Sequence, residues 1–470
     1  MKVTTIRSSW MEGYGYRLDT RPYVGGVLET KMLLESFKKT VPLKSLTKGF
    51  DGGIYNGPQF VRNYVDSPEF GVPFMTGGSM LRADLSNLPL LSSQDAHNQK
   101  LRHLELQPGM ALISCSGTIG KLCYSRRQML GVWTSQDILK VVADPAKIQS
   151  GYLYGYLCSK FGIPLVAAGT YGAIIQHLEP QHLWDLPVPR LADALEHEIH
   201  TLVEQAAELL TESSIQVANA TKLFFECVGL KDITSIEWHN DREKDLGFSA
   251  TLPGPYSLRS INYSPRCKNL WDKIQSKTWK PLSALCVPGK LGRGGRNMRV
   301  DADPEHGFEL IGQRELFYTK PEGRWVARTS VGPDSLLENG TIAIAAQGTL
   351  GEGEVYCRAQ FVCGPWTKYA FSEHILRVVA DESKMLRGCL FAFLRSETAF
   401  RMLRSMTSGS KQQDNHYYFL PRMPIPVPKQ KDQEEINQMV LGAFEKLHIA
   451  VANQDKAVAL IEKTIDARAK

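Results

Sequence analysis

The sequence predicts an α+β protein that consists of two copies of a mixed α/β domain, joined by two long antiparallel coiled-coil helices. Three observations predict this fold: a decapeptide that occurs twice, a series of shorter matches in the same order, and two apolar stripes of equal spacing. The chain of 470 residues is also long for one domain, because single cores become rare beyond about 250–300 residues. Two or more domains are therefore expected.

The duplicated decapeptide is SQDILKVVAD at residues 135–144 and SEHILRVVAD at residues 372–381, which lie 237 positions apart. Its β-branched and aliphatic run, bounded by polar residues, is typical of a strand in the core. The same shift places GYLYGYL at Gly151 on GCLFAFL at Gly388. A short helix is expected after each decapeptide.

Further matches surround the decapeptide once small insertions are allowed. PLKSL at Pro42 matches PLSAL at Pro281, and DLPVP ending at Pro189 matches PIPVP ending at Pro428. The segments MALISCSGTIGKLCYS and GTIAIAAQGTLGEGEVYC both read as a strand, a glycine turn and a second strand. The stretches between these matches differ. This pattern indicates a duplicated scaffold whose copies diverged at their binding surfaces.

Two long helices are predicted near residues 191–230 and 429–470, because apolar residues recur there at alternating spacings of three and four. The alternative is that each is an amphipathic helix lying on its own globular core; the narrow stripes with small residues favour close pairing of the two helices. The predicted seam consists of Ile199, Val203, Leu210, Val217, Phe224, Ile436, Val440, Leu447 and Ile461.

Composition limits the class of protein. Hydrophobic residues make up 43% and charged residues 22% of the chain, as in ordinary folded proteins. The sequence has neither a signal-peptide pattern nor an uncharged apolar stretch near twenty residues, so we expect a cytoplasmic protein with no membrane segment. The nine cysteines are scattered singly, which indicates reduced thiols. A net charge of +6 permits a nucleic-acid partner but does not require one.

Motifs of common enzymes are absent from the sequence. It contains no Pro-Pro dipeptide, which the active-site motif of an amino-methyltransferase would require, and no P-loop, GxSxG or HExxH. His197 and His200 lie one helical turn apart, but a solvated helix face explains them better than a metal site. Asp301, Asp303 and Glu309 could imitate the acidic cluster of a Mg²⁺-dependent nuclease, with a solvated loop as the alternative. We therefore predict no catalytic residue and no metal ligand.

Polar and basic residues gather at the glycine turns and at two loops in corresponding places of the repeat. Backbone N–H groups, hydroxyls and amines at such tips suit phosphates, whereas arginine, lysine and glutamine can also read base edges. Ordinary hairpin turns and solvated loops remain the alternatives for each tip taken alone. The candidate DNA contacts are Gly117, Thr118, Lys121, Arg126, Arg127, Thr170 and Gln176 in the first copy and Lys290, Arg293, Arg296, Gly348, Thr349, Ser410, Lys411, Gln412 and Gln413 in the second.

Several of these segments together carry a resemblance to a known family. They are RLD at Arg17, PLKSL, ISCSGTIGKL with SQDILKV, GYLYGYLCSKFG and GTYGAIIQHLEPQHLWDLPVP at Gly169, with their second-copy counterparts. Over almost its full length the chain resembles the specificity (S) subunit of type I restriction-modification systems. The second copy departs from the pattern at GSKQQDNHYYFLPRMPIPVP, which lacks the hydrophobic phasing of IIQHLEP in the first copy.

The resemblance implies a non-catalytic subunit that reads a split, asymmetric site in double-stranded DNA. Two target-recognition domains would each read one half, and the helices would space them. Two methylation (M) subunits that bind S-adenosylmethionine would be partners, and ATP-dependent restriction (R) subunits could complete the complex; this chain itself would bind no cofactor. The implied domains are a lead-in at 1–40, recognition domain 1 at 41–190, a central spacer helix at 191–230, a lead-in with recognition domain 2 at 231–428, and a C-terminal spacer helix at 429–470.

Two alternatives from other classes stay open at this point. One is the Mg²⁺-dependent nuclease built on the three carboxylates named above. The other is a protein-interaction scaffold whose two domains bind proteins instead of DNA. Residues 1–13 and 232–250 lie outside the repeat, because neither segment has a clear counterpart in the other copy.

Overall fold

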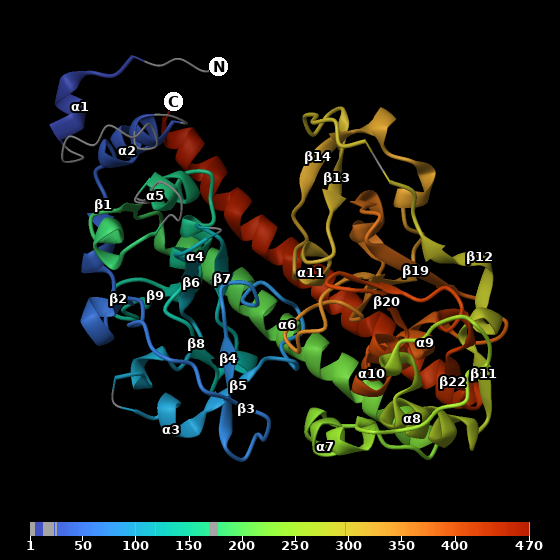
Figure 1. Ribbon diagram of the computed structural model, residues 1–470. Coiled ribbons are helices and arrows are strands. Elements are labelled where there is room, and N and C mark those ends of the chain that lie inside the picture. Colours follow the sequence, from blue (N-terminus) through green and yellow to red (C-terminus); the bar gives the residue numbers. More distant parts are fainter. Residues whose placement is uncertain are drawn as a thin grey trace. The chain divides into compact units, whose positions relative to one another are not determined.

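The computed structural model describes residues 5–12, 23, 26–98, 100–117, 119–168, 177–296 and 298–469 (Figure 1). The chain divides into two compact units. Unit 1 comprises residues 1–81, 88–211 and 449–470, and unit 2 comprises residues 82–87 and 212–448. Within the described part of the chain, no helix is long and apolar enough to cross a membrane.

Unit 1 is built around a four-stranded sheet with the order β2-β9-β6-β7. A second sheet has the order β3-β5-β4-β8, and β1 pairs with β10. The strands are β1 (Thr40–Pro42), β2 (Ile54–Tyr55), β3 (Tyr64–Val65), β4 (Gly71–Met75), β5 (Leu90–Ser92), β6 (Ala111–Ser114), β7 (Leu122–Tyr124), β8 (Trp133–Thr134), β9 (Ile138–Val141) and β10 (Pro187–Pro189). The shorter helices are α1 (Ser8–Glu12), α2 (Val27–Glu35), α3 (Ser93–Ala96), α4 (Ser150–Leu157) and α5 (Gly162–Ala168).

Unit 2 repeats this plan. Its main sheet has the order β12-β19-β15-β17, a second sheet has the order β14-β13-β18, and β11 pairs with β22. The strands are β11 (Trp279–Pro281), β12 (Cys286–Arg293), β13 (Gly307–Ile311), β14 (Arg324–Ala327), β15 (Thr341–Ala345), β16 (Gln347–Gly348), β17 (Ala359–Val362), β18 (Ala370–Phe371), β19 (Ile375–Ala380), β20 (Thr407–Gly409), β21 (Gln413–Asn415) and β22 (Pro424–Pro426). The shorter helices are α7 (Ser235–Asn240), α8 (Pro265–Gln275), α9 (Arg387–Leu394) and α10 (Glu397–Ser405).

The predicted duplication is present in strand pairing as well as in sequence. Each decapeptide forms an inner strand of a main sheet: β9 lies between β2 and β6, and β19 lies between β12 and β15. Even the divergent stretches share a feature, since β4 pairs in parallel with β8 and β13 pairs in parallel with β18. One sequence match needs correction. The ladders equate the strand ending at Pro189 with the one ending at Pro426, not at Pro428.

The two long helices are α6 (Asp193–Cys227) and α11 (Gln430–Ala469). Unit 1 contains the start of α6 and the end of α11, and unit 2 contains the end of α6 and the start of α11, so the two helices are antiparallel. In unit 1, Ile199 and Val203 share a core with Ile461 and Ile465. In unit 2, Gln216 donates to the carbonyl oxygen of Met439 at 2.9 Å.

The residues of the predicted helix seam lie at buried or half-buried positions. Val217 is half-buried, and the side chains buried at the other predicted positions are those of Ile199, Val203, Leu210, Phe224, Ile436, Val440, Leu447 and Ile461. The alternative, in which each long helix lies on its own globular core, also holds in part. Ile199 and Val203 pack on the core of unit 1 as well as on α11. Ile199 and Val203 therefore serve both contacts at once.

A close helix crossing occurs once in each copy. The backbone N–H of Gly151 in α4 donates to Nδ1 of His200 in α6 at 3.2 Å, and that of Gly388 in α9 donates to Oδ1 of Asn437 in α11 at 2.9 Å. A Cβ on Gly151 would lie 2.9 Å from the Cα of His200, and one on Gly388 would lie 3.0 Å from the Cα of Asn437. Only glycine fits where the backbones approach so closely.

The units differ from the linear domains implied by the resemblance. Each includes halves of both long helices, because antiparallel pairing brings the start of one helix to the end of the other. Residues 82–87 lie inside the range of the first recognition domain, yet they belong to unit 2. There the N–H of Ala83 donates to the carbonyl oxygen of Phe317 at 3.0 Å, and Asp84 pairs with Arg395 at 2.6 Å.

Candidate nucleic-acid interface

The candidate interface of unit 1 is the turn between β6 and β7. Gly117 is exposed, has a φ of 72°, and has open space around the position of a Cβ. The turn is held by Ser114, whose Oγ accepts from the N–H of Lys121 at 3.0 Å and whose carbonyl oxygen accepts from the N–H of Gly120 at 3.0 Å. Ser116 forms an antiparallel bridge with His177. Thr118, Thr170 and Gln176 lie outside the described residues.

Two arginines follow the first hairpin, and their positions differ. Arg127 is exposed and lies 3.8 Å from a carboxylate oxygen of Glu208. Arg126 is only 2% exposed, and its Nε donates to Oε1 of Gln128 at 3.3 Å. A buried guanidinium does not suit a contact with DNA, so we withdraw Arg126 from the candidate residues. Lys121 is half-buried.

In unit 2 the corresponding turn is part of a three-stranded sheet with the order β16-β21-β20. Gln347 pairs with Asp414 and Gly348 pairs with Gln413. Residues directly opposite each other in an antiparallel ladder have side chains on the same face, and successive residues alternate between faces. Gln413 is buried and a Cβ on Gly348 would meet Tyr356 at 2.9 Å. The face that carries Gln347 and Asp414 is therefore the open one.

Arg293, at the end of β12, supports this sheet. Its Nη2 atom donates to the carbonyl oxygen of Ala346 at 3.1 Å and forms an ion pair with Asp414. The side chain of Arg293 is 28% exposed and that of Asp414 is 39% exposed, so the pair remains accessible from solvent. The structure thus brings together an arginine and a carboxylate that lie far apart in the sequence.

The hairpin between β20 and β21 presents the second loop predicted from the sequence. Ser410, Lys411 and Gln412 are exposed at its tip, where Gly409 has a φ of 96°. Gln413 is only 4% exposed, and its Nε2 donates to the carbonyl oxygen of Ser410. The burial of Gln413 follows from its place on the inner face of the ladder, so we withdraw it from the candidate residues. Thr349 is exposed beside the half-buried Gly348.

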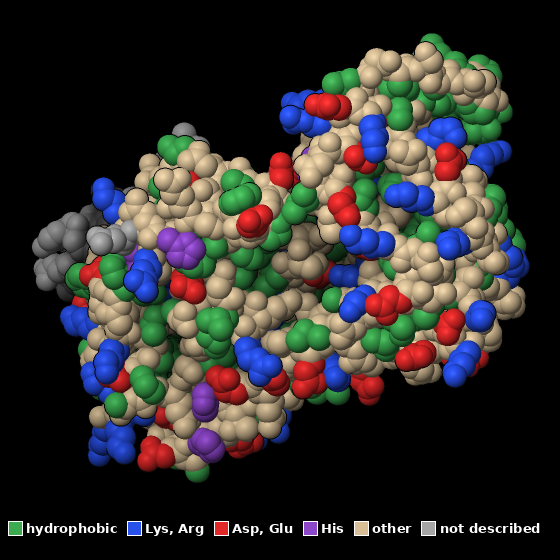
Figure 2. All heavy atoms as spheres, turned by 90° about the horizontal axis from the view of Figure 1, so that it is seen from below, with side chains coloured by type: hydrophobic (Ala, Val, Ile, Leu, Met, Phe, Trp, Pro, Cys, Tyr) green, Lys and Arg blue, Asp and Glu red, His purple; other side chains and the backbone are tan. Residues whose placement is uncertain are grey.

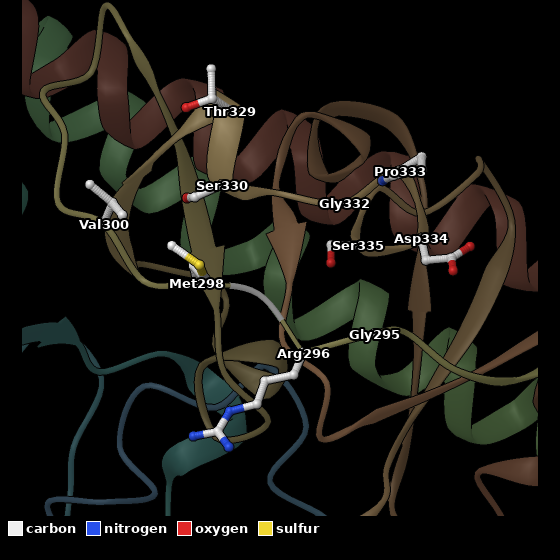
Figure 3. Close-up of a pocket in the computed structure, with 10 residues that line it drawn as sticks. All are labelled: Gly295, Arg296, Met298, Val300, Thr329, Ser330, Gly332, Pro333, Asp334 and Ser335. Atoms are coloured by element: carbon white, nitrogen blue, oxygen red, sulfur yellow. The ribbon is translucent and has the colours of Figure 1, made fainter.

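The basic segment after β12 is also on the surface. Lys290 pairs with Glu338 at 2.6 Å. Arg296 is exposed and lines a pocket of about 370 Å³ with Met298 and Val300. Figure 3 shows the Arg296 side chain extending away from these two apolar residues. Figure 2 shows Lys and Arg side chains interspersed with Asp and Glu over the drawn face, so the cations there do not form one continuous basic surface.

The carboxylates of the nuclease alternative have separate partners. Asp301 pairs with Arg324, whose hydrogen bond lowers the pKa of that carboxyl group, and Asp303 bonds His306 at 2.8 Å. Glu309 accepts from the N–H of Gly323 at 2.7 Å. Among the described residues, no group of three or more His, Cys, Asp or Glu side chains could hold a metal ion.

The histidine pair is likewise engaged in the packing of unit 1. Nδ1 of His197 bonds Nε2 of Gln149 at 3.1 Å, and Nδ1 of His200 accepts from the N–H of Gly151. Burial lowers the pKa of His200. The Nδ1 atom of each ring is therefore engaged within unit 1.

Sequence reasoning missed two residues of the candidate interface, Gln313 and Asp414. A third residue, Gln347, lies in the glycine turn predicted for the second copy. Gln313 follows β13 and its side chain bonds the backbone of Gln347, while Asp414 lies opposite Gln347 in the ladder. One signal was available for Asp414, because the shift of 237 positions places it on His177. No local signal identified Gln313, since its role depends on a contact between strands that are distant in sequence.

Comparison with models of protein families finds no match for this sequence, and comparison with curated proteins finds none either. Among solved structures, the chain is similar to the S subunit of a type I restriction-modification system from M. genitalium, with 13% identity, a TM-score of 0.34, and coverage of 92% of this chain and 95% of that one. It is also similar to the HsdS subunit from Thermoanaerobacter tengcongensis, with 10% identity, a TM-score of 0.24, and coverage of 90% and 95%. A third similar chain comes from a study of complex assembly and conformational transition of the type I R-M system, with 12% identity, a TM-score of 0.25, and coverage of 92% and 96%.

Proposed function

We propose that this chain is the non-catalytic DNA sequence-recognition subunit of a type I restriction-modification complex, in which each unit reads one half of a split site. One observation carries the proposal: the two units share their strand pairing and their glycine crossing, but they present different polar residues at the corresponding turns. Ser116 faces His177 in one unit, and Gln347 faces Asp414 in the other. Such a pair suits a target whose two halves have different sequences.

The remaining parts of the complex follow from the resemblance in sequence. Two M subunits with S-adenosylmethionine would methylate adenine, and R subunits with ATP would cleave DNA. The long helices would set the distance between the two half-sites. This chain would supply recognition only, and it would act in the cytoplasm, where the DNA is.

The first experiment is a map of methylated adenines in the genome of the organism that encodes the chain, with and without its gene. We expect one split motif to disappear, with two short half-sites around a fixed gap. If no motif changes, the proposal is wrong and a protein-interaction scaffold becomes the better explanation.

A second experiment measures the affinity of the purified complex for a duplex containing that motif, as a function of salt. Contacts with phosphates release counterions, so affinity should fall steeply as salt increases. Lys411→Ala should weaken binding to all sequences alike and lower the salt slope by about one, because the exposed Lys411 is expected to contact a phosphate. Lys268→Ala is the matched control, since Lys268 is exposed on α8 and pairs with Asp272.

A further inference from the structure

The open face of the β16-β21-β20 sheet carries a row of polar side chains. Gln347 lies opposite Asp414, and Asp414 lies opposite Ser408 on its other side. All three therefore project from one face, and Arg293 reaches Asp414 from β12. The row combines an amide, a carboxylate, a hydroxyl and a guanidinium, which are the groups that read base edges in protein–DNA complexes.

The backbone of Gln347 is held by a neighbouring side chain as well as by the ladder. Its carbonyl oxygen accepts from Nε2 of Gln313 at 2.6 Å, and its N–H donates to Oε1 of the same side chain at 3.4 Å. The preceding residue, Ala346, donates its N–H to the carbonyl oxygen of His374 at 2.9 Å and accepts from Arg293. Contacts on both sides therefore fix the direction in which the Gln347 side chain leaves the sheet.

The amide of Gln347 is itself available. The residue is half-buried, and among the described residues no hydrogen bond to its amide group is present. A fixed backbone sets the position and direction from which the side chain starts, whereas the χ angles of the glutamine are ordered only when it binds. The structure thus presents a donor and an acceptor from a fixed point of the sheet without using either.

We propose that Gln347 reads an adenine in the half-site of unit 2. Its amide oxygen would accept from the N6 amino group, and its amide nitrogen would donate to N7, the bidentate pairing that distinguishes adenine in the major groove. Asp414 and Arg293 are positioning residues, because their ion pair fixes the strand opposite Gln347. This inference rests on the proposed function and adds to it the identity of one base-reading residue and of its base.

The corresponding residue of unit 1 has different chemistry. Ser116 bridges His177 as Gln347 pairs with Asp414. A serine hydroxyl is shorter and cannot make the bidentate contact, so the same position should read the two half-sites differently. Replacement of Gln347 should consequently alter one half-site and leave the other unchanged.

The test maps methylated adenines in cells whose only copy of the gene encodes Gln347→Ala, beside wild-type cells. We expect the preference for adenine at one position of a single half-site to fall by on the order of 10- to 100-fold, with the gap and the other half-site unchanged. Ser116→Ala is the matched control and should leave the half-site of unit 2 unchanged. Gln347→Glu keeps the acceptor and removes the donor, so it should lose the same preference.

Two outcomes would overturn the inference. An unchanged motif in Gln347→Ala cells would show that this side chain reads no base. Loss of the whole motif would show a general role in binding or folding, and urea unfolding of the purified variant would distinguish those two. Failure of the proposed function is recognised separately, because wild-type cells would then show no split motif that depends on this gene.

Discussion

The two inner strands β9 and β19 have almost the same sequence, yet their corresponding cations, Lys140 and Arg377, have different surroundings. Lys140 in β9 is fully buried, its Nζ donates to the carbonyl oxygen of Ile138 at 3.2 Å, and burial lowers its pKa to about 7. Arg377 in β19 is half-buried, with its side chain 19% exposed. It donates to the carbonyl oxygens of Gly292, Arg293 and Asp334 at 3.3, 2.6 and 2.7 Å.

The neighbouring strand explains this difference. In unit 2, the eight-residue β12 extends past Arg377 and supplies two of its acceptors. In unit 1, β2 has only two residues and brings the ring of Tyr55 to 5.7 Å from the Lys140 ammonium. A repeated strand therefore keeps its apolar residues, while the role of its one cation depends on the partner strand.

The largest expected effect is a pH dependence of the free energy of unfolding that comes from Lys140 and has no counterpart at Arg377. Below pH 7 the lysine is protonated in the folded and the unfolded chain. Between about pH 7 and its ordinary value of 10.5, the folded protein has released a proton that the unfolded chain still binds. The free energy of unfolding of the wild type should therefore rise relative to that of Lys140→Met, by up to about 1.4 kcal/mol per pH unit in this window.

Urea unfolding at a series of pH values measures this difference. Lys140→Met should be the more stable protein below pH 7, because it removes a buried charge, and the advantage should disappear as pH rises. The control is Arg377→Met, which should be destabilised at every pH by about 1–3 kcal/mol since it leaves carbonyl oxygens without a donor. Parallel behaviour of the two variants would contradict the comparison.

The next effect should be equal in the two units. Gly151→Ala and Gly388→Ala should each lower the free energy of unfolding by about 1–3 kcal/mol, because the added methyl group would press on the backbone of the long helix. Gly292→Ala in β12 is the matched control, with nothing within 4 Å of the added Cβ. A large effect in one unit and none in the other would show that the crossing is not a shared element.

The smallest expected effect is the loss of one hydrogen bond that occurs in unit 1 and not in unit 2. The hydroxyl of Tyr156 in α4 donates to the carbonyl oxygen of Pro187 in β10, whereas the corresponding residue of α9 is Phe393. Tyr156→Phe should lower the free energy of unfolding by about 0.5–1.5 kcal/mol, the usual net value of one hydrogen bond. Tyr64→Phe, at a half-exposed site, should have no measurable effect. Thermal unfolding can compare the two variants, and equal midpoints would contradict this expectation.

Much of the fold could be predicted because it depends on patterns that repeat locally. The spacing of Ile199 and Val203 identified the helix seam, and the run around Leu139 identified a core strand. Both patterns reflect the regular alternation of buried and exposed positions along an element. The duplication strengthened each prediction, because a signal in one copy could be checked in the other.

The candidate interface was predictable only in part. Its glycine turns and exposed loop residues, such as Gly117 and Lys411, were visible in the sequence. Arg126 and Gln413 have the same chemistry as their exposed neighbours, and only the structure places them inside. The types of residue thus located the turns and loops of the candidate interface, but they did not show which side of each strand faces solvent.

The sequence by itself determined the match of the two decapeptides, the inner strand of each main sheet and the apolar stripes of the long helices, since each arises from the order of apolar and polar residues along the chain. Only the tertiary structure decided that β16 pairs with β21, that Gln313 holds Gln347, and that residues 82–87 belong to unit 2. These contacts join segments far apart in sequence, so no local spacing encodes them. Which of these contacts form depends on which backbone groups remain unpaired once the cores have packed.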